Sequence, residues 1–114
     1  IDLRTGRTRW AQPLGREVAA RDSSEMATWG TPNTGGALVT AGGVLFISAA
    51  KDEMLRAFDV ETGALLWSAK LPAGGQATPM TYQRNGRQYV VIAAGGHGDF
   101  GVTRGDHVVA FALP

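Results

Sequence analysis

The sequence predicts an all-β fold of short antiparallel strands, and three observations lead to this prediction. Sixteen glycines stand in short clusters among the 114 residues. The runs between these clusters are rich in β-branched and aromatic side chains, which favour strands over helices. A turn motif that ends in tryptophan also occurs twice, at a spacing typical of repeated small sheets.

The first half of the chain predicts one complete sheet. Ile1 is expected to lie within a strand, and the polar, aperiodic stretch 15–28 is expected to be a loop. Four strand-like runs follow, separated by turns that contain Gly, Asp or Glu. They predict an antiparallel meander with strands at 37–40, 44–49, 54–59 and 64–70.

The second half predicts a smaller group of strands. These are expected at 78–82, 88–93 and 107–111. The turn that joins the first two contains Asn85-Gly86, which favours a type I′ hairpin because both residues tolerate φ > 0. This half therefore predicts one strand fewer than the first sheet.

The repeated turn motif has a clear physical use. Residues 2–10 match residues 59–67 as Asp-x-x-Thr-Gly-x-x-x-Trp, so the two copies stand 57 residues apart. The Asp and Thr side chains can bond the turn backbone, the Gly can take φ > 0, and the Trp returns as a large side chain for the core.

A spacing of about 50 residues for a four-stranded sheet is typical of radial repetition, as in β-propellers. About two blades are expected: 1–14 ends a preceding blade, 15–35 is an inter-blade loop, 36–72 is a complete four-stranded blade, and 73–114 is a last, incomplete blade. Two blades cannot close a ring. The open strand edges are therefore expected to promote self-association of this segment.

Charge and cysteine content exclude several classes of partner. Eleven Lys and Arg stand against ten Asp and Glu, and no run of like charges suits nucleic acid, so no nucleic-acid partner is expected. Cysteine is absent, which excludes disulfides and thiolate metal sites. No apolar run reaches the roughly 18 residues of a membrane span. Any membrane anchor is therefore expected upstream of Ile1.

The tryptophan-ended turn resembles the tryptophan-docking motif of quinoprotein dehydrogenase propellers. Longer stretches resemble the C-terminal end of the membrane-bound glucose and quinate dehydrogenase branch of that family. They are residues 30–36 (GTPNTGG), 40–47 (TAGGVLFI), 71–82 (LPAGGQATPMTY) and 95–98 (GGHG).

The resemblance implies an eight-bladed propeller of four-stranded antiparallel sheets that holds pyrroloquinoline quinone (PQQ) and a calcium or magnesium ion. The implied parent enzyme, a PQQ-dependent oxidoreductase, oxidises a sugar or cyclic polyol at the periplasmic face of the bacterial inner membrane and passes electrons to ubiquinone. The resemblance also places the catalytic base and the metal ligands in other blades. We therefore expect no catalytic residue and no metal ligand in this chain, which by itself should be inactive and should need the remaining blades as partners.

Three residues are candidates for contact with the cofactor. Asn33 stands at the entry to the innermost strand, where its amide could bond a quinone oxygen, although a turn asparagine that bonds its own backbone is the alternative. His97 is flanked by glycines, and the resemblance places an active-site aromatic ring there. Asp52 lies in a blade turn and could support the site indirectly, with a solvated turn as the alternative. His107 is expected at the surface.

Three other interpretations fit the sequence less well. Residues 96–101 satisfy the dinucleotide pattern G-x-G-x-x-G, but no helix can open after it, so a dinucleotide site is rejected. A non-catalytic propeller that serves as an assembly scaffold would carry similar repeats. Such a scaffold would not need residues 30–33 together with 95–98, which favours the enzyme, and a sugar-binding lectin propeller would need more exposed aromatic residues than Trp29.

Overall fold

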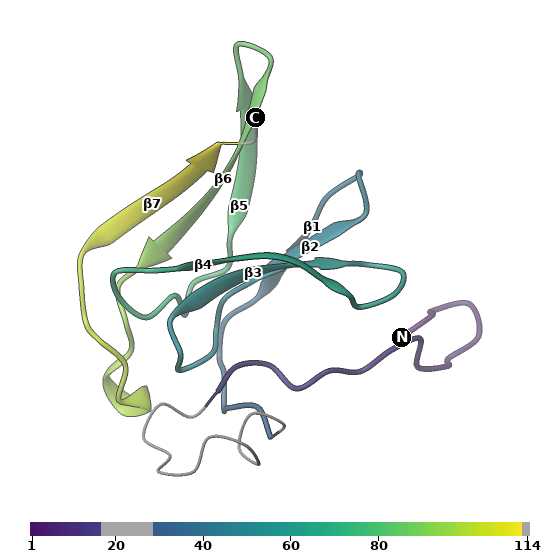
Figure 1. Cartoon of the computed structure of the whole chain (residues 1–114), viewed down its shortest axis with the longest axis horizontal. Helices are drawn as coiled ribbons and strands as arrows, with labels where there is room; N and C mark the ends of the chain where they lie inside the picture. Colours follow the sequence, from purple (N-terminus) through teal and green to yellow (C-terminus); the bar gives the residue numbers. More distant parts are fainter. Residues whose placement is uncertain (17–28, 113–114) are drawn as a thin grey trace.

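The computed structural model describes residues 1–16 and 29–112, and within these it has seven strands in two antiparallel sheets (Figure 1). Most of the expected loop at 15–28 lies outside the described residues. Sheet 1 has the order β1-β2-β3-β4, with strands Ala37–Val39, Val44–Ile47, Met54–Asp59 and Leu65–Lys70. Sheet 2 has the order β5-β6-β7, with strands Met80–Arg84, Arg87–Ala94 and His107–Ala112.

Sheet 1 follows the expected meander closely. Every neighbouring pair is antiparallel, and the register places Ala57 of β3 opposite both Phe46 of β2 and Trp67 of β4. The second strand ends at Ile47, two residues earlier than expected, because Ala49 takes φ 60° and so cannot continue a strand. The prediction of an all-β meander is confirmed, with ends shifted by one or two residues.

Sheet 2 contains the expected hairpin. Asn85 has φ 52° and Gly86 has φ 75°, as a type I′ turn requires. Its first strand begins at Met80 instead of residue 78, directly after Pro79, which has no N–H to offer a neighbouring strand. The third strand, β7, pairs with β6 along its whole length.

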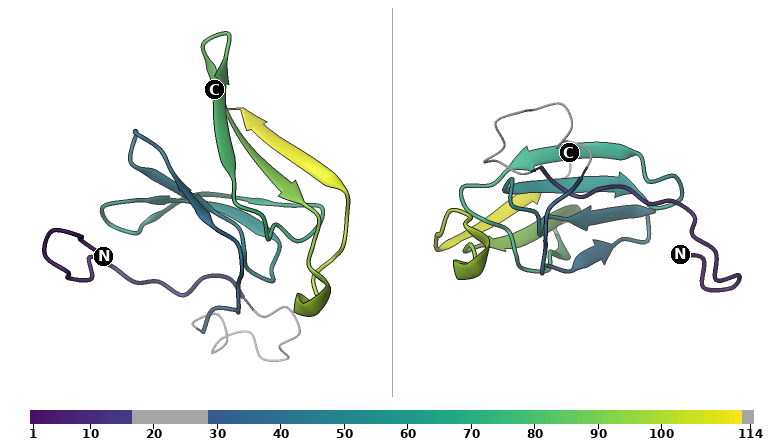
Figure 2. Two further views of the ribbon diagram at one scale, coloured as in Figure 1. Left: turned by 180° about the vertical axis from the view of Figure 1, so that it is seen from behind. Right: turned by 90° about the horizontal axis from the view of Figure 1, so that it is seen from below.

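The N-terminal residues form no strand, which corrects the expectation for Ile1. Residues 1–16 consist of a turn at the start and an extended segment, and Ile1 is 80% exposed. No other described strand lies alongside to supply the ladder hydrogen bonds that a strand requires. The segment instead runs beside the face of sheet 1 that is turned away from sheet 2 (Figures 1 and 2).

The two copies of the turn motif have the same local structure. In each copy the Gly backbone N–H donates to the Asp carbonyl over 2.8 Å, and the Asp carboxylate accepts bonds from backbone N–H groups two and three residues ahead. These bonds hold the pKa of both Asp2 and Asp59 below the ordinary value, chiefly through the backbone N–H groups of Arg4 and Thr62 respectively. The repeat seen in the sequence is therefore a repeat of structure.

Trp10 docks onto the second copy of this turn. Its indole Nε1 donates to the Val60 carbonyl over 2.9 Å, and its ring stacks on Phe58 with centroids 6.5 Å apart. A Cβ placed on Gly63 would lie 2.6 Å from Cδ2 of Trp10, so only glycine lets the indole approach this closely. On the opposite face of sheet 1, Trp67 meets the ring of Phe111 edge-on at 5.0 Å.

The hydrophobic core lies between the two sheets. Alternate residues of β3 and β6 point toward each other, while Phe58 on the other face of β3 points toward Trp10. The buried residues of this core are Phe46, Leu55, Ala57, Leu71, Ala73, Val90, Ile92 and Ala94. Sheet 1 thus has contacts on both faces, with sheet 2 on one and with Trp10 of the N-terminal segment on the other.

Among residues 1–16 and 29–112, no helix is long and apolar enough to cross a membrane.

Candidate functional site

Four segments gather at one end of the two sheets, at the lower left of Figure 1. They are the segment that leads into β1 (29–36) and the connections β2–β3 (48–53), β4–β5 (71–79) and β6–β7 (95–106). We call this end the loop face. Consecutive antiparallel strands turn alternately at the two ends of a sheet, which is why these connections meet here. All three candidate residues, Asn33, Asp52 and His97, lie on the loop face.

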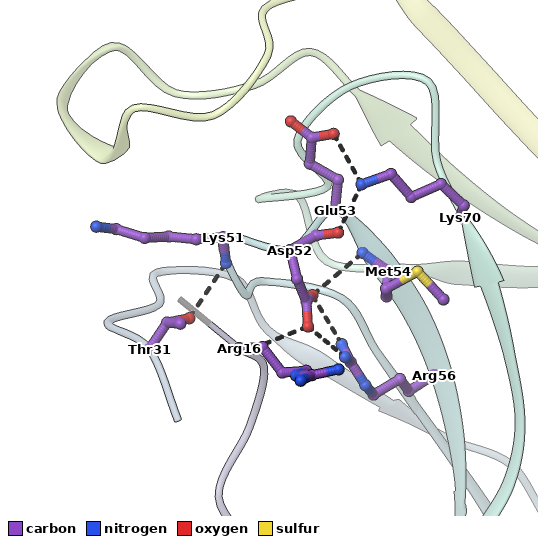
Figure 3. Close-up of polar contacts among 8 residues, drawn as sticks. All are labelled: Arg16, Thr31, Lys51, Asp52, Glu53, Met54, Arg56 and Lys70. Atoms are coloured by element: carbon purple, nitrogen blue, oxygen red, sulfur yellow. Dashed lines mark hydrogen bonds and ion pairs between the residues drawn. The ribbon is translucent and has the colours of Figure 1, made fainter. Parts of the chain in front are cut away.

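The connection from Ser48 to Glu53, here called the hub loop, bonds to the other three segments and to the N-terminal chain. Figure 3 shows part of this network. The bonds are Ala49 N to Gly75 O (2.7 Å), Lys51 N to Thr31 Oγ1 (3.1 Å), Arg16 N to Asp52 Oδ2 (3.0 Å) and Thr103 N to Glu53 Oε1 (2.7 Å). The hub loop therefore fixes the positions of its neighbours on the loop face.

The backbone of the hub loop is strained. Ala49 has φ 60° and Glu53 has φ 59°, in the left-handed region that non-glycine residues rarely adopt. Ala49 and Ala50 are buried almost completely. A non-glycine residue in the left-handed region costs about 1–3 kcal/mol, so it persists only where the surrounding contacts hold it. Residues of this kind are concentrated at functional sites.

Asp52 is a buried ion-pair partner, so the interpretation as a solvated turn is wrong. The residue is only 8% exposed, and both of its carboxylate oxygens bond the guanidinium of Arg56. It also accepts from the backbone N–H groups of Arg16 and Met54 (Figure 3). These bonds hold the hub loop in place, and indirect support of a cofactor site by Asp52 stays a prediction.

Glu53 joins the two sheets. Its Oε1 accepts from Thr103 N, and its Oε2 lies 3.1 Å from Nζ of Lys70, which also donates to the Asp52 carbonyl over 2.8 Å. Partial burial opposes ionisation, but the bonds from Thr103 and Lys70 outweigh it and hold the pKa of Glu53 below its ordinary value. Sequence reasoning missed this residue, because its partner Thr103, in the connection between β6 and β7, is 50 positions away and no local pattern marks the pair.

His97 is exposed and caps a single 3-10 turn, η2 (Gly98–Phe100). Its Nδ1 accepts from Asp99 N at 3.3 Å, and its ring meets Phe100 edge-on at 5.1 Å. Because Nδ1 is the acceptor, the neutral imidazole carries its proton on Nε2 and presents an N–H donor there. No α-helix opens in this part of the described chain, and Gly101 turns left-handed at φ 65°, so the expectation that no helix follows the G-x-G-x-x-G pattern is confirmed.

Asn33 is exposed, and its amide Nδ2 lies 3.5 Å from the Thr31 carbonyl. This is the long local contact of a turn asparagine, the alternative considered from the sequence. A contact between Asn33 and a cofactor stays a prediction. His107 is exposed, as expected, and lies 4.0 Å from Asp106.

Two buried polar atoms on the loop face have no hydrogen-bond partner in the described structure. They are Ser48 Oγ, on a residue with no exposed surface, and Gln76 Nε2. The other end of the Gln76 amide is held by Thr34, whose hydroxyl lies 3.4 Å from Oε1. Among the described residues, no group of three His, Cys, Asp or Glu is placed to hold a metal ion.

The comparison with protein families gives a match over most of the chain. Residues 1–90 match the PQQ family described as "Glucose/ethanol/alcohol dehydrogenase, beta-propeller domain".

Relatives that are named as quinoprotein or quinone-linked dehydrogenases match over all or nearly all of the chain. Quinoprotein glucose dehydrogenase A of Acinetobacter calcoaceticus is 51% identical over 120 residues, and the quinoprotein glucose dehydrogenase of Escherichia coli (strain K12) is 49% identical over 121 residues. Quinate/shikimate dehydrogenase (quinone) of Acinetobacter baylyi is 41% identical and matches 99% of the chain. The chain spans only 15% of the length of each of these relatives.

Solved structures agree with the fold. A europium-containing methanol dehydrogenase is 34% identical with a TM-score of 0.56, over 60% of this chain and 12% of that one. A quinohemoprotein alcohol dehydrogenase from Comamonas testosteroni is 27% identical with a TM-score of 0.55, over 76% of this chain and 15% of that one. The predicted all-β propeller architecture and the family resemblance are both confirmed, and the chain belongs to the β-propeller domain family of the PQQ-dependent glucose, ethanol and alcohol dehydrogenases.

Proposed function

We propose that this chain is the C-terminal propeller segment of a PQQ-dependent dehydrogenase that oxidises a sugar or cyclic polyol of the glucose or quinate type. The observation that carries the proposal is the identity of about half of all residues, over the whole chain, with two quinoprotein glucose dehydrogenases. The loop face is the part of this segment that we assign to the active site.

The loop face fits a cofactor rich in hydrogen-bond acceptors. Ser48 Oγ and Gln76 Nε2 are buried without a partner, and leaving such a group unpaired costs about 1–3 kcal/mol. PQQ carries quinone and carboxylate oxygens, which accept hydrogen bonds. The buried amide of Gln76, held at its other end by Thr34, is therefore suited to donate to such a ligand.

In this proposal, the residues of this chain bind and orient the cofactor and the substrate. When bound, the quinone cofactor accepts the hydride that leaves the alcohol carbon of the substrate. His97 would hold a proton on Nε2 and donate it as a hydrogen bond to a quinone or substrate oxygen, and Asn33 would donate from its amide. Asp52 would act through the hub loop, because Arg56 and two backbone N–H groups already occupy its carboxylate.

The remaining parts of the site are assigned to other blades. Following the family resemblance, we place the calcium or magnesium ion and the catalytic base on blades outside this chain. We also propose that the parent works at the periplasmic face of the inner membrane with ubiquinone as acceptor, and that this segment alone is inactive. The support is the family itself and the word "quinone" in the names of the quinate dehydrogenases.

The direct test is turnover by the full-length protein that carries this chain. After loading with PQQ and calcium, we expect it to reduce a ubiquinone analogue with glucose, quinate or a related polyol, and to fail without PQQ. Binding of PQQ with no turnover on any of these substrates would contradict the proposed substrate class. Absence of both binding and turnover would favour the non-catalytic scaffold instead.

A further inference from the structure

Glu53 occupies the junction between the hub loop and sheet 2. It is the last residue of the hub loop, directly before β3, and its side chain is only 14% exposed. The carboxylate leaves sheet 1 and reaches residues 95–105, here called the His97 loop, in the connection between β6 and β7. The bond that Glu53 accepts from Thr103 N therefore links the hub loop to the His97 loop through a side chain.

The contact fixes the His97 loop at its stem. Thr103 donates its N–H to Glu53 Oε1 over 2.7 Å and accepts at its carbonyl from Gly74 N over 3.0 Å. Thr103 also packs directly against Gly96, where even a Cβ would collide with the Thr103 carbonyl. Gly96 is the neighbour of His97 in the chain. Thr103 is therefore in direct contact with the backbone next to His97, and both Thr103 and Gly96 are bonded to Gly74.

Lys70 holds the carboxylate in the orientation that this contact needs. Its ammonium lies 3.1 Å from Glu53 Oε2 and donates to the Asp52 carbonyl over 2.8 Å. The two oxygens of Glu53 thus have different partners, Lys70 in β4 and Thr103 in the His97 loop. A hydrogen bond to an ionised acceptor is stronger than one between neutral groups.

The strained backbone of Glu53 indicates that its side chain contributes to stability. At φ 59° a glycine would fit with less strain, and a glutamate costs about 1–3 kcal/mol at such a position. The contacts of the side chain must offset this cost. Replacing Glu53 by glycine would therefore relieve strain and release the His97 loop in the same variant.

We propose that Glu53 is a positioning residue, which holds the His97 loop on the loop face so that His97 is oriented toward the cofactor. This inference rests on the proposed function. It goes beyond it by naming a residue that touches neither cofactor nor substrate and acts through the Thr103 peptide.

A purely structural role makes a different prediction. If Glu53 only stabilises the fold, its replacement lowers the thermal midpoint and leaves cofactor affinity per folded molecule unchanged. If Glu53 positions His97, the His97 loop becomes mobile and cofactor affinity falls even where the fold is as stable as before. Glu53→Gly separates the two roles, because the relief of strain at φ 59° compensates part of the lost stability.

The test compares Glu53→Gly and the isosteric Glu53→Gln in the full-length protein, with Glu61→Gln as the matched control. Glu61 is a carboxylate on the turn between β3 and β4, 69% exposed at its side chain and paired with Arg9, at the opposite end of sheet 1. Hydrogen exchange of residues 95–105 is measured without cofactor, and PQQ affinity is measured by equilibrium titration with calcium.

For Glu53→Gly we expect exchange at Thr103 to accelerate about tenfold and PQQ affinity to fall about tenfold, the equivalent of one charged hydrogen bond. Glu53→Gln keeps an acceptor oxygen and should show a smaller loss, and Glu61→Gln should change neither quantity. Faster exchange with unchanged PQQ affinity would overturn the positioning role. Unchanged exchange would overturn the contact itself. A wild-type protein that binds no PQQ would instead overturn the proposed function, and the exchange data would still report on the contact.

Discussion

At the scale of single residues, what the sequence predicts well is what its near neighbours determine. The Asp-x-x-Thr-Gly turn closes through bonds over two to four positions, so the repeat was enough to predict it. Glu53 and Asp52 were the opposite case. The ion pair between Asp52 and Arg56 and the bond from Thr103 N to Glu53 depend on how the loops pack. Neither the residue types nor their spacing in the sequence predicts these contacts.

Gly63 offers a residue-scale prediction with an internal control. Gly6 and Gly63 occupy the same position in the two turns, with φ 70° and 75°, but only Gly63 lies under a docked indole, whereas nothing lies within 4 Å of a Cβ on Gly6. Both Gly→Ala variants incur backbone strain, and Gly63→Ala also displaces Trp10. We expect Gly63→Ala to destabilise by about 1–3 kcal/mol more than Gly6→Ala in urea unfolding. Equal losses would show that Trp10 is not docked on Gly63.

A second prediction concerns pH. The folded-state pKa of Glu53 lies below the ordinary value of 4.5, so its ionised contacts stabilise the fold fully above about pH 4.5 and are lost as the pH falls through the lowered pKa. The stability difference between wild type and Glu53→Gln should be constant near neutrality and shrink toward zero in acid. Urea midpoints from pH 7 to pH 3 measure it. A difference that grows in acid would contradict the direction of the shift.

At the scale of elements, strand order and turn type followed from the sequence, while strand ends and the N-terminal segment did not. The hairpin at Asn85-Gly86 has the φ values that its residue types favour. The prediction of a strand at Ile1 was wrong. A strand needs a neighbouring strand to pair with, and the sequence of residues 1–10 does not show whether such a neighbour is present. Trp10 instead anchors this segment through a side-chain contact.

The three-stranded sheet leads to a prediction about association. Sheet 2 ends at β7, whose outer edge pairs with no other described strand, and Val108 on this strand is 75% exposed. An open edge of this kind favours pairing with another chain, and a charge on it opposes pairing. We expect the isolated 114-residue chain to show a concentration-dependent mass in sedimentation, and Val108→Lys to reduce it.

Leu3→Lys is the control for this experiment. Leu3 is 96% exposed and lies outside every strand, so its replacement removes as much exposed apolar surface without touching the edge. Its sedimentation should match that of wild type. A wild-type mass of one 12.0 kDa chain at every concentration would rule out edge pairing.

At the scale of the whole molecule, the repeat was sufficient to predict the propeller architecture, while the blade boundaries drawn from it stay a prediction. The chemistry of the site was predictable only through family resemblance. Asn33 and His97 both lie on the loop face, but their observed bonds are local ones to Thr31 and Asp99. Residues that complete a propeller site belong to other blades, and one segment cannot specify them.

The central claim is that the loop face of this segment forms part of a PQQ site. Its most direct test is an equilibrium titration of PQQ, with calcium, into the full-length protein and into its His97→Ala variant. Loss of a hydrogen bond to an ionised or strongly polar ligand should weaken binding by about tenfold or more. Saturable binding that weakens in the variant is the predicted result. Equal affinity in the two proteins would place the cofactor away from His97 and would contradict the assignment of the loop face.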